Sequence, residues 1–234
     1  MSPDASSDPA RAHVRTPRLT RVVAAYRRRR FAWLFVSLLL TLGAGSTLDA
    51  LAAPYNPLEL LLAVNLLAAI ASVAHEGEVW LPLLLGIAFV AARALQAIFG
   101  MSGLLPVGDG LWLTVIGITT VTSVRYALRP GVVDAERILA ALDAYLLAGL
   151  LFGIAYWTLD RAWPGSFGGT DSGSLDLSGA IYFSFVTIAT LGYGDVVPAS
   201  DPARGLAMVE GVSGQLYLAV LVARLVSLYA RQRD

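Results

Sequence analysis

Residues 187–195, TIATLGYGD, decide the fold of this 234-residue chain. They close an apolar stretch of roughly 12 residues, which is too short to cross a membrane as a helix. Longer apolar segments lie on both sides, at 138–159 and 203–229. We therefore expect a re-entrant helix over 179–189, followed by a non-helical strand over 190–195. Such backbone is tolerated at membrane depth only where it is buried in protein or lines a watery path.

The composition indicates a membrane protein. Hydrophobic residues make up 56% of the chain and charged residues 15%, whereas a soluble domain carries about a quarter charged residues. The absence of cysteine excludes disulfides, thiolate metal sites and cysteine nucleophiles. The expected fold class is an all-α membrane protein with six transmembrane helices, because six apolar segments approach the length of a span. These segments are 31–48, 58–74, 79–99, 111–128, 138–159 and 203–229.

The arginines predict the orientation. All 17 basic residues are Arg, and loops rich in arginine stay in the cytoplasm. Eight precede the first segment, three lie around the loop between the fourth and fifth, and three end or follow the sixth. With six spans these groups fall on one side, so we expect both termini in the cytoplasm and residues 160–202 outside. The expected location is the plasma membrane, and the arginines before residue 31 either contact anionic lipids or only set the topology.

The string at 190–195, TLGYGD, resembles the selectivity filter of potassium channels, which usually reads TVGYG followed by Asp. The resemblance covers residues 138–229 and departs from the usual string only at Leu191. It implies a homotetramer, in which three identical subunits join this one around a central axis. It also implies passive, K+-selective conduction through a pore that needs no organic cofactor.

Backbone carbonyls replace the hydration shell of K+ in that family. The resemblance therefore assigns K+ binding to Thr190, Leu191, Gly192 and Tyr193. Gly192 and Gly194 suit this role because glycine adopts positive φ without steric cost. The C-terminal end of the preceding helix, near Ala189, would favour a cation in the cavity below the filter.

Residues on and after the short helix are expected to support this strand. Tyr193 would point away from the pore and pack near Tyr182 and Phe183, and Asp195 would tie the mouth of the filter to the helix. Some members of the family carry a carboxylate at the position of Val186. The expected supporting residues are Tyr182, Phe183, Val186 and Thr187.

Two glycines lie in the first half of the sixth segment, Gly211 and Gly214. A glycine in this helix serves as a gating hinge in potassium channels, and Gly214 stands at the matching distance from the filter. Close helix packing explains the same residues, since small side chains crowd the contacts between membrane helices. The sequence leaves both interpretations open.

Charged residues inside apolar segments are the remaining candidates. Arg93 in the third segment either snorkels, pairs with a polar group such as Glu59 or Asn65, or has a functional role. Glu210 in the sixth segment either supports the region behind the filter, attracts cations or is a hydrogen-bonded carboxylate packed near the pore helix. Asp143, near the inner end of the fifth segment, is expected to be solvated at the membrane interface.

The domain organisation follows from these segments. We expect a cytoplasmic Arg-rich tail over 1–30, a four-helix domain over 31–130 and a pore domain over 131–234. The fourth segment contains only Arg125, with Arg129 beyond it, whereas a voltage sensor needs about 3–4 gating charges. We therefore expect no voltage sensing by this helix. We also expect no soluble regulatory module after the sixth segment.

Other function classes are less well supported by the sequence. No catalytic, phosphate-binding or metal-ligand motif is present, so we expect no enzyme. The basic residues adjoin a span and accompany no nucleic-acid-binding motif, so we expect no nucleic-acid partner. Two alternatives to a channel remain: a subunit of a K+ uptake transporter, and a non-conducting membrane scaffold with a vestigial filter.

Overall fold

The computed structural model describes residues 29–49, 105–129, 134–169 and 173–231, with single positions between 58 and 88. This part of the chain is almost entirely helical, which confirms the all-α expectation. The predicted segment at 79–99 and the tail before residue 29 lie largely outside the described residues. The elements are α2 (Arg30–Asp49), α5 (Leu105–Ala127), α6 (Ala135–Ala162), β1 (Phe167–Gly168), α7 (Leu177–Ile188), β2 (Val197–Pro198) and α8 (Asp201–Arg231).

Two of these helices, α6 and α8, are long and apolar enough to cross a membrane. Both are longer than the apolar segments from which the sequence predicts them, because capping and polar residues extend their ends. Asp134 caps α6 by accepting a hydrogen bond from the Arg137 backbone N–H at 3.0 Å. Pro202 lies in the first turn of α8, where a missing N–H costs nothing.

The helix α5 begins before residue 111, the predicted start of the fourth segment. Its first turns contain Asp109, whose carboxylate is 2.8 Å from the guanidinium of Arg161 in the last turn of α6. The Arg161 guanidinium also lies over the Trp157 ring. A partly buried ion pair thus allows α5 to extend through a polar residue that hydropathy alone excludes.

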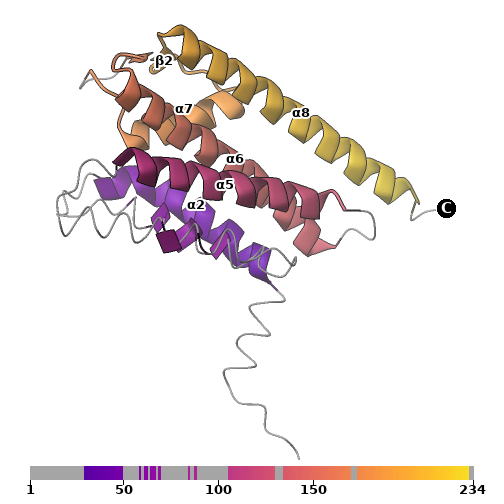
Figure 1. The fold of residues 1–234 in the computed structure, drawn as a ribbon. Coiled ribbons are helices and arrows are strands. Elements are labelled where there is room, and N and C mark those ends of the chain that lie inside the picture. The colour runs from indigo at the N-terminus through magenta and orange to yellow at the C-terminus, as the bar shows by residue number, and fades with distance from the viewer. Residues whose placement is uncertain are drawn as a thin grey trace, which may run out of the picture.

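The first core lies between α2, α5 and α6, which run side by side in Figure 1. Each helix contributes apolar side chains at helical spacing, and both α2 and α5 pack against α6. The most deeply buried members are Leu34, Leu38, Trp112, Val115, Leu147, Leu150 and Ile154.

The helix α7 packs against α6 and α8, and α8 extends along the opposite side of the molecule from α2 (Figure 1). The connections before and after α7 are joined by a two-stranded antiparallel pairing, with Phe167 opposite Pro198. Buried Asp160 accepts hydrogen bonds from the backbone N–H groups of Ser166 at 3.0 Å and Leu175 at 2.7 Å. The Asp160 contacts fix the connection between α6 and α7.

The far end of α8 is tied to the end of α5. The Arg224 guanidinium donates hydrogen bonds to the backbone carbonyls of Ala127, at 2.6 Å, and of Arg129. These carbonyls follow the last turn of a helix, where no intrahelical donor is left for them. The C-terminal part of α8 is therefore coupled to a helix far from it in sequence.

Candidate functional site

The helix before the GYG string is α7, which has 12 residues. At about 1.5 Å per residue it is far shorter than the roughly 30 Å hydrocarbon core. The Asp176 side chain caps its start by accepting from the Gly179 N–H at 2.7 Å. The helix ends at Ile188, with Ala189 as C-cap, and its bounds lie within two residues of the 179–189 expected from the sequence.

Three glycines on the neighbouring helices form the seat of α7. A Cβ at Gly149 would lie 2.6 Å from the Phe185 ring, one at Gly153 would lie 2.9 Å from the Ile181 Cα, and one at Gly214 would lie 2.5 Å from Ile188 Cγ1. The contacted residues recur at helical spacing on one face of α7. The seat therefore accepts α7 only because these three positions carry no side chain.

The C-terminal end of α7 is anchored by polar side chains from both flanking helices. The Ile188 carbonyl accepts hydrogen bonds from the Tyr145 hydroxyl of α6 at 3.1 Å and from the Gln215 amide of α8 at 3.3 Å. A carbonyl in the last turn has no intrahelical donor. These two donors satisfy it and hold the start of the strand at 190–195 in place.

The chain from 190 to 195 has the irregular backbone that the glycines predict. Gly192 and Gly194 have φ of 59° and 80°, and Thr190 has φ of 59°. A left-handed non-glycine residue costs about 1–2 kcal/mol, so the surroundings must hold Thr190 in this conformation. No other described non-glycine residue has positive φ.

Backbone hydrogen bonds to the last turn of α7 hold this strand. The Val186 carbonyl accepts from the N–H groups of Leu191 at 2.9 Å and Gly192 at 3.3 Å, and the Thr187 carbonyl accepts from Thr190 at 3.0 Å. Val186 and Thr187 were expected to support the filter, and these bonds are made by their backbone carbonyls.

The outer end of the strand is tied back to α7 through Asp195. Its carboxylate accepts a hydrogen bond from the Tyr182 hydroxyl at 2.6 Å. This bond, and to a lesser extent the Val196 backbone N–H, lowers the pKa of Asp195 below its ordinary value. The Tyr193 and Tyr182 rings stack with centroids 6.5 Å apart. Tyr182, Tyr193 and Asp195 therefore form one unit at the mouth of the strand.

Phe183 has a different environment from the one expected. Its ring lies edge-on to those of Tyr156, at 5.0 Å, and Phe167, at 5.4 Å. It is buried in an aromatic cluster with them, on α7, α6 and β1, and has no ring contact with Tyr193 among the described residues. The prediction that Tyr193 packs near Tyr182 is confirmed, but packing near Phe183 is not observed, because neighbouring positions on a helix face different directions.

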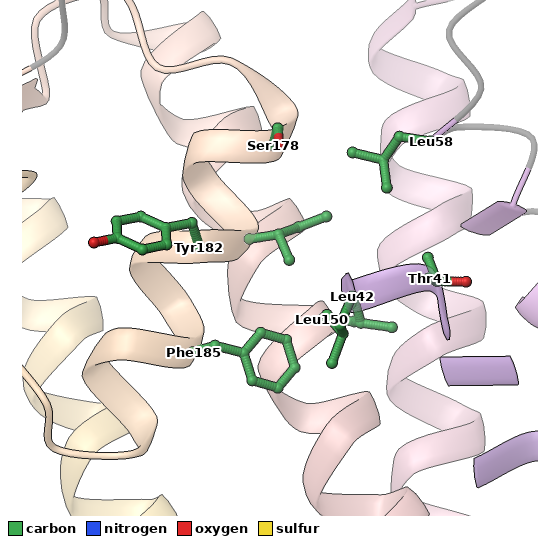
Figure 2. A pocket seen from close by; sticks show the side chains of 8 residues that line it. Thr41, Leu42, Leu58, Leu150, Ser178, Tyr182 and Phe185 are labelled. Atoms are coloured by element: carbon green, nitrogen blue, oxygen red, sulfur yellow. The ribbon is translucent and has the colours of Figure 1, made fainter. Parts of the chain in front are cut away.

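A cavity of about 300 Å³ lies on the side of α7 that faces α2. Figure 2 shows Ser178, Tyr182 and Phe185 of α7 on one side of it, with Thr41 and Leu42 of α2 opposite. Its lining is mainly apolar. Ile181 and Phe185 line this cavity and also contact the glycine seat, so the packing of α7 is looser toward α2 than toward Gly149 and Gly153.

Glu210 is fully buried behind α7, where it accepts a hydrogen bond from the Tyr156 hydroxyl and lies within hydrogen-bonding distance of Ser184 Oγ. This arrangement agrees with the interpretation of Glu210 as a hydrogen-bonded carboxyl group. Gly211 has open space at its Cβ position, whereas Gly214 contacts Ile188. Within one subunit, the packing interpretation is therefore supported for Gly214, whereas no described atom contacts the Cβ position of Gly211.

Arg93 lies outside the described residues. One of its candidate partners, Asn65, donates its side-chain amide to the Thr41 hydroxyl at 2.5 Å. The expectation for Asp143 is wrong, because its carboxylate is fully buried and not solvated. Both of its oxygens lack a hydrogen-bond partner among the described residues.

Sequence reasoning missed most residues that hold α7 and the strand. The pair Gly149 and Gly153 forms a small-xxx-small pattern, which was a usable signal for close helix packing. Tyr145, Gln215 and Asp160 carry no local pattern, because each acts on residues far away in the sequence.

Comparison with known proteins defines the class of this site. Residues 143–231 match a protein-family model described as Ion channel. This segment contains most of α6 and all of α7, the GYG strand and α8. The segment that is similar to an ion channel therefore consists of two long apolar helices around a short one.

The similar curated proteins are potassium channels, and the predicted resemblance is confirmed for this segment. An inward rectifier potassium channel, Kirbac3.1 of Paramagnetospirillum magnetotacticum, is 35% identical over 91 residues, which cover 37% of this chain and 28% of that protein. Two-pore potassium channel 4 of Arabidopsis thaliana is 37% identical over 82 residues, which cover 35% and 27%. Two pore potassium channel c of Oryza sativa subsp. japonica is 31% identical over 83 residues, which cover 36% and 18%.

These matches are confined to the channel segment. The chain spans less than a third of the length of each of these relatives. No solved structure shows a significant match to the chain.

Proposed function

We propose that this chain forms a homotetrameric pore that conducts K+ passively and rejects Na+. The observation that carries the proposal is the backbone of 190–195, an irregular strand with three left-handed residues at the end of a short apolar helix. It lies between two helices long enough to cross a membrane. A strand of this kind at membrane depth must be covered by protein or line a watery path.

The carbonyls of Thr190, Leu191, Gly192 and Tyr193 would bind K+ in place of water. The four residues are exposed in the single subunit, so no other part of the described chain covers them. Carbonyls of one strand surround an ion on one side only, and copies of the strand would complete the cage. The Thr190 hydroxyl would add an oxygen at the inner end.

The surface of α8 supports assembly from copies of the chain. Within one subunit, 50% of the most apolar stretch of α6 is buried inside the protein. Only 11% of the corresponding stretch of α8 is buried. Large apolar side chains of α8 are left exposed, and an apolar face of this extent indicates a contact surface or lipid. They include Met208, Val209, Val212, Leu216 and Val220. In the proposed tetramer α8 lines the inner pore and packs against its copies.

The remaining organisation is proposed from the sequence. Six spans, with both termini in the cytoplasm of a plasma membrane, leave the loops around α7 on the outer side. The four helices before residue 131 would surround the pore domain and contact lipid. Voltage sensing by α5 is not expected, because Arg125 and Arg129 both lie at its inner end.

Purified protein in planar bilayers tests the proposal. Reversal potentials in mixed K+ and Na+ should follow the K+ gradient, and chemical crosslinking in detergent should stop at four subunits. Steady conductance should change little with voltage. Equal permeability to Na+ in the unmodified protein would refute the filter assignment, and oligomers without any K+ current would favour the scaffold alternative.

A further inference from the structure

The polar cluster behind α7 links all three helices of the channel segment. Glu210 of α8, Ser184 of α7 and Tyr156 of α6 are each completely buried. We propose that Glu210 is a positioning residue that keeps its proton and acts as a neutral hydrogen-bonding clamp between these helices. Its effect on K+ selectivity rests on the proposed function, whereas its protonation state does not.

Three contacts between oxygen atoms define the cluster. The Tyr156 hydroxyl donates to Glu210 Oε2 at 2.5 Å. Ser184 Oγ is within hydrogen-bonding distance of Glu210 Oε1. The same Ser184 Oγ lies 2.6 Å from the Gly149 backbone carbonyl. The chain of contacts therefore runs from α6 to α8, on to α7 and back to α6.

A count of hydrogens assigns the proton. A serine hydroxyl carries one hydrogen, while a carbonyl and an ionised carboxylate carry none. With Glu210 ionised, Tyr156 and Ser184 supply two hydrogens for three contacts, and one pair of oxygens would face each other without a hydrogen. With a proton on Oε1, Glu210 donates to Ser184, which donates to Gly149, while Tyr156 donates to Oε2. Three hydrogens then serve three contacts.

The surroundings offer no charge to compensate a carboxylate. Neither of the two ion pairs in the described part of the chain involves Glu210. The titratable groups facing it are Tyr156 and, more remotely, Tyr145, both on α6. Below Tyr156 lie the rings of Phe167 and Phe183. Burying an unpaired charge in such a place is strongly unfavourable, so the neutral acid is the stable form.

The clamp reaches the filter through α7. Ser184 lies in the turn before Val186, whose carbonyl holds the N–H groups of Leu191 and Gly192. The glycine seat of α7 consists of apolar contacts, which oppose sliding and rotation less strictly than directed hydrogen bonds. Glu210 fixes the middle of α7, as Tyr145 and Gln215 fix its end.

Infrared difference spectroscopy of the purified protein tests the proton without any current. At neutral pH carboxyl groups with ordinary pKa values are ionised. The spectrum of the unmodified protein minus that of Glu210→Gln should show the carbonyl band of a neutral carboxylic acid. Asp143→Asn is the matched control, because Asp143 is the other fully buried carboxyl of the described chain. Carboxylate bands in the Glu210 difference spectrum would overturn the proposal.

Bilayer recordings test the positioning role. Glutamine donates and accepts as the neutral acid does, so Glu210→Gln should retain the K+/Na+ permeability ratio. Ser184→Ala removes the central link and should lower that ratio roughly tenfold, the effect of about one lost hydrogen bond. If Glu210→Gln lowers the ratio or the conductance as much as Ser184→Ala, the charge of Glu210 matters and the neutral clamp is wrong.

The two measurements separate the two claims. A neutral-acid band in a protein that passes no selective K+ current would leave the protonation of Glu210 established and refute the proposed function. A K+-selective current from a protein with a carboxylate at Glu210 would support the proposed function and refute the neutral clamp.

Discussion

Gly214 of α8 lies directly against Ile188 at the end of α7, so that a Cβ at position 214 would come within 2.5 Å of Ile188 Cγ1. Gly211, one turn earlier on the same helix, has open space where its Cβ would be. Both glycines are hinge candidates in the sequence, but within one subunit only Gly214 takes part in the seat of α7. Substitutions at these two positions therefore distinguish a packing role of glycine from a hinge role.

We expect Gly214→Ala to destabilise the protein by about 1–3 kcal/mol, because the added methyl group overpacks a tight contact. It should also reduce K+ conduction by displacing Ile188 and the filter start. Gly211→Ala is the matched control and should stabilise the helix by up to about 1 kcal/mol. Thermal unfolding in detergent and bilayer currents measure both. If Gly211→Ala abolishes gating while Gly214→Ala changes neither stability nor current, a hinge at Gly211 is favoured.

Gly192→Ala should reduce K+/Na+ selectivity or abolish conduction. Gly192 has φ of 59°, and an alanine there costs about 1–2 kcal/mol and turns the carbonyls away from a common axis. Gly165→Ala provides the control, because Gly165 also has positive φ, 82°, and open space at its Cβ position. Both variants carry the same backbone strain, so a selectivity loss in both would assign the effect to general destabilisation.

Acidification of the outer solution should weaken the Tyr182–Asp195 contact. The hydrogen bond to Tyr182 lowers the pKa of Asp195, so the ionised, bonded form contributes stability above the ordinary aspartate pKa. This contribution is lost as the pH falls through the lowered value. We expect selective current to fall off in that acidic range.

Tyr182→Phe tests the same contact from the other side. It removes the donor and lets the pKa of Asp195 return toward its ordinary value of 3.8. The acid-induced loss of current should therefore begin at higher pH than in the unmodified protein. Recordings over a series of outer pH values measure the shift, and an unchanged profile would contradict the role of the tyrosine hydroxyl.

Asp160→Ala should destabilise the connection between α6 and α7. It leaves the N–H groups of Ser166 and Leu175 without their acceptor, and each unsatisfied buried donor costs about 1–3 kcal/mol. Asp160→Asn keeps one carbonyl oxygen and should lose less. Thermal unfolding of both variants shows which is the less stable. Equal stability of the alanine and asparagine variants would argue against backbone capping by this side chain.

The sequence predicted the short helix well because its signals are local. An apolar run of limited length places α7 to within two residues. The positive φ of Gly192 and Gly194 likewise follows from their residue type. The left-handed Thr190 was not predicted, because a β-branched residue enters that region only when its surroundings force it.

Contacts between helices could not be predicted in the same way. Phe183 faces Tyr156 and Phe167, and Asp143 is buried and not solvated. Hydropathy locates a helix in the membrane but leaves its rotation about its own axis open. If a helix rotates about its own axis, a side chain that faced lipid or water comes to face a neighbouring helix.

By itself, then, the sequence determined an apolar helical chain with a GYGD strand between a short helix and a long one, because length, composition and glycine conformation act over a few neighbouring residues. Only the tertiary structure decided that Gly149, Gly153 and Gly214 form the seat of α7, and that Glu210 meets Tyr156 and Ser184. These contacts join residues 26 to 54 positions apart. They exist only once the helices have packed in one relative rotation and depth.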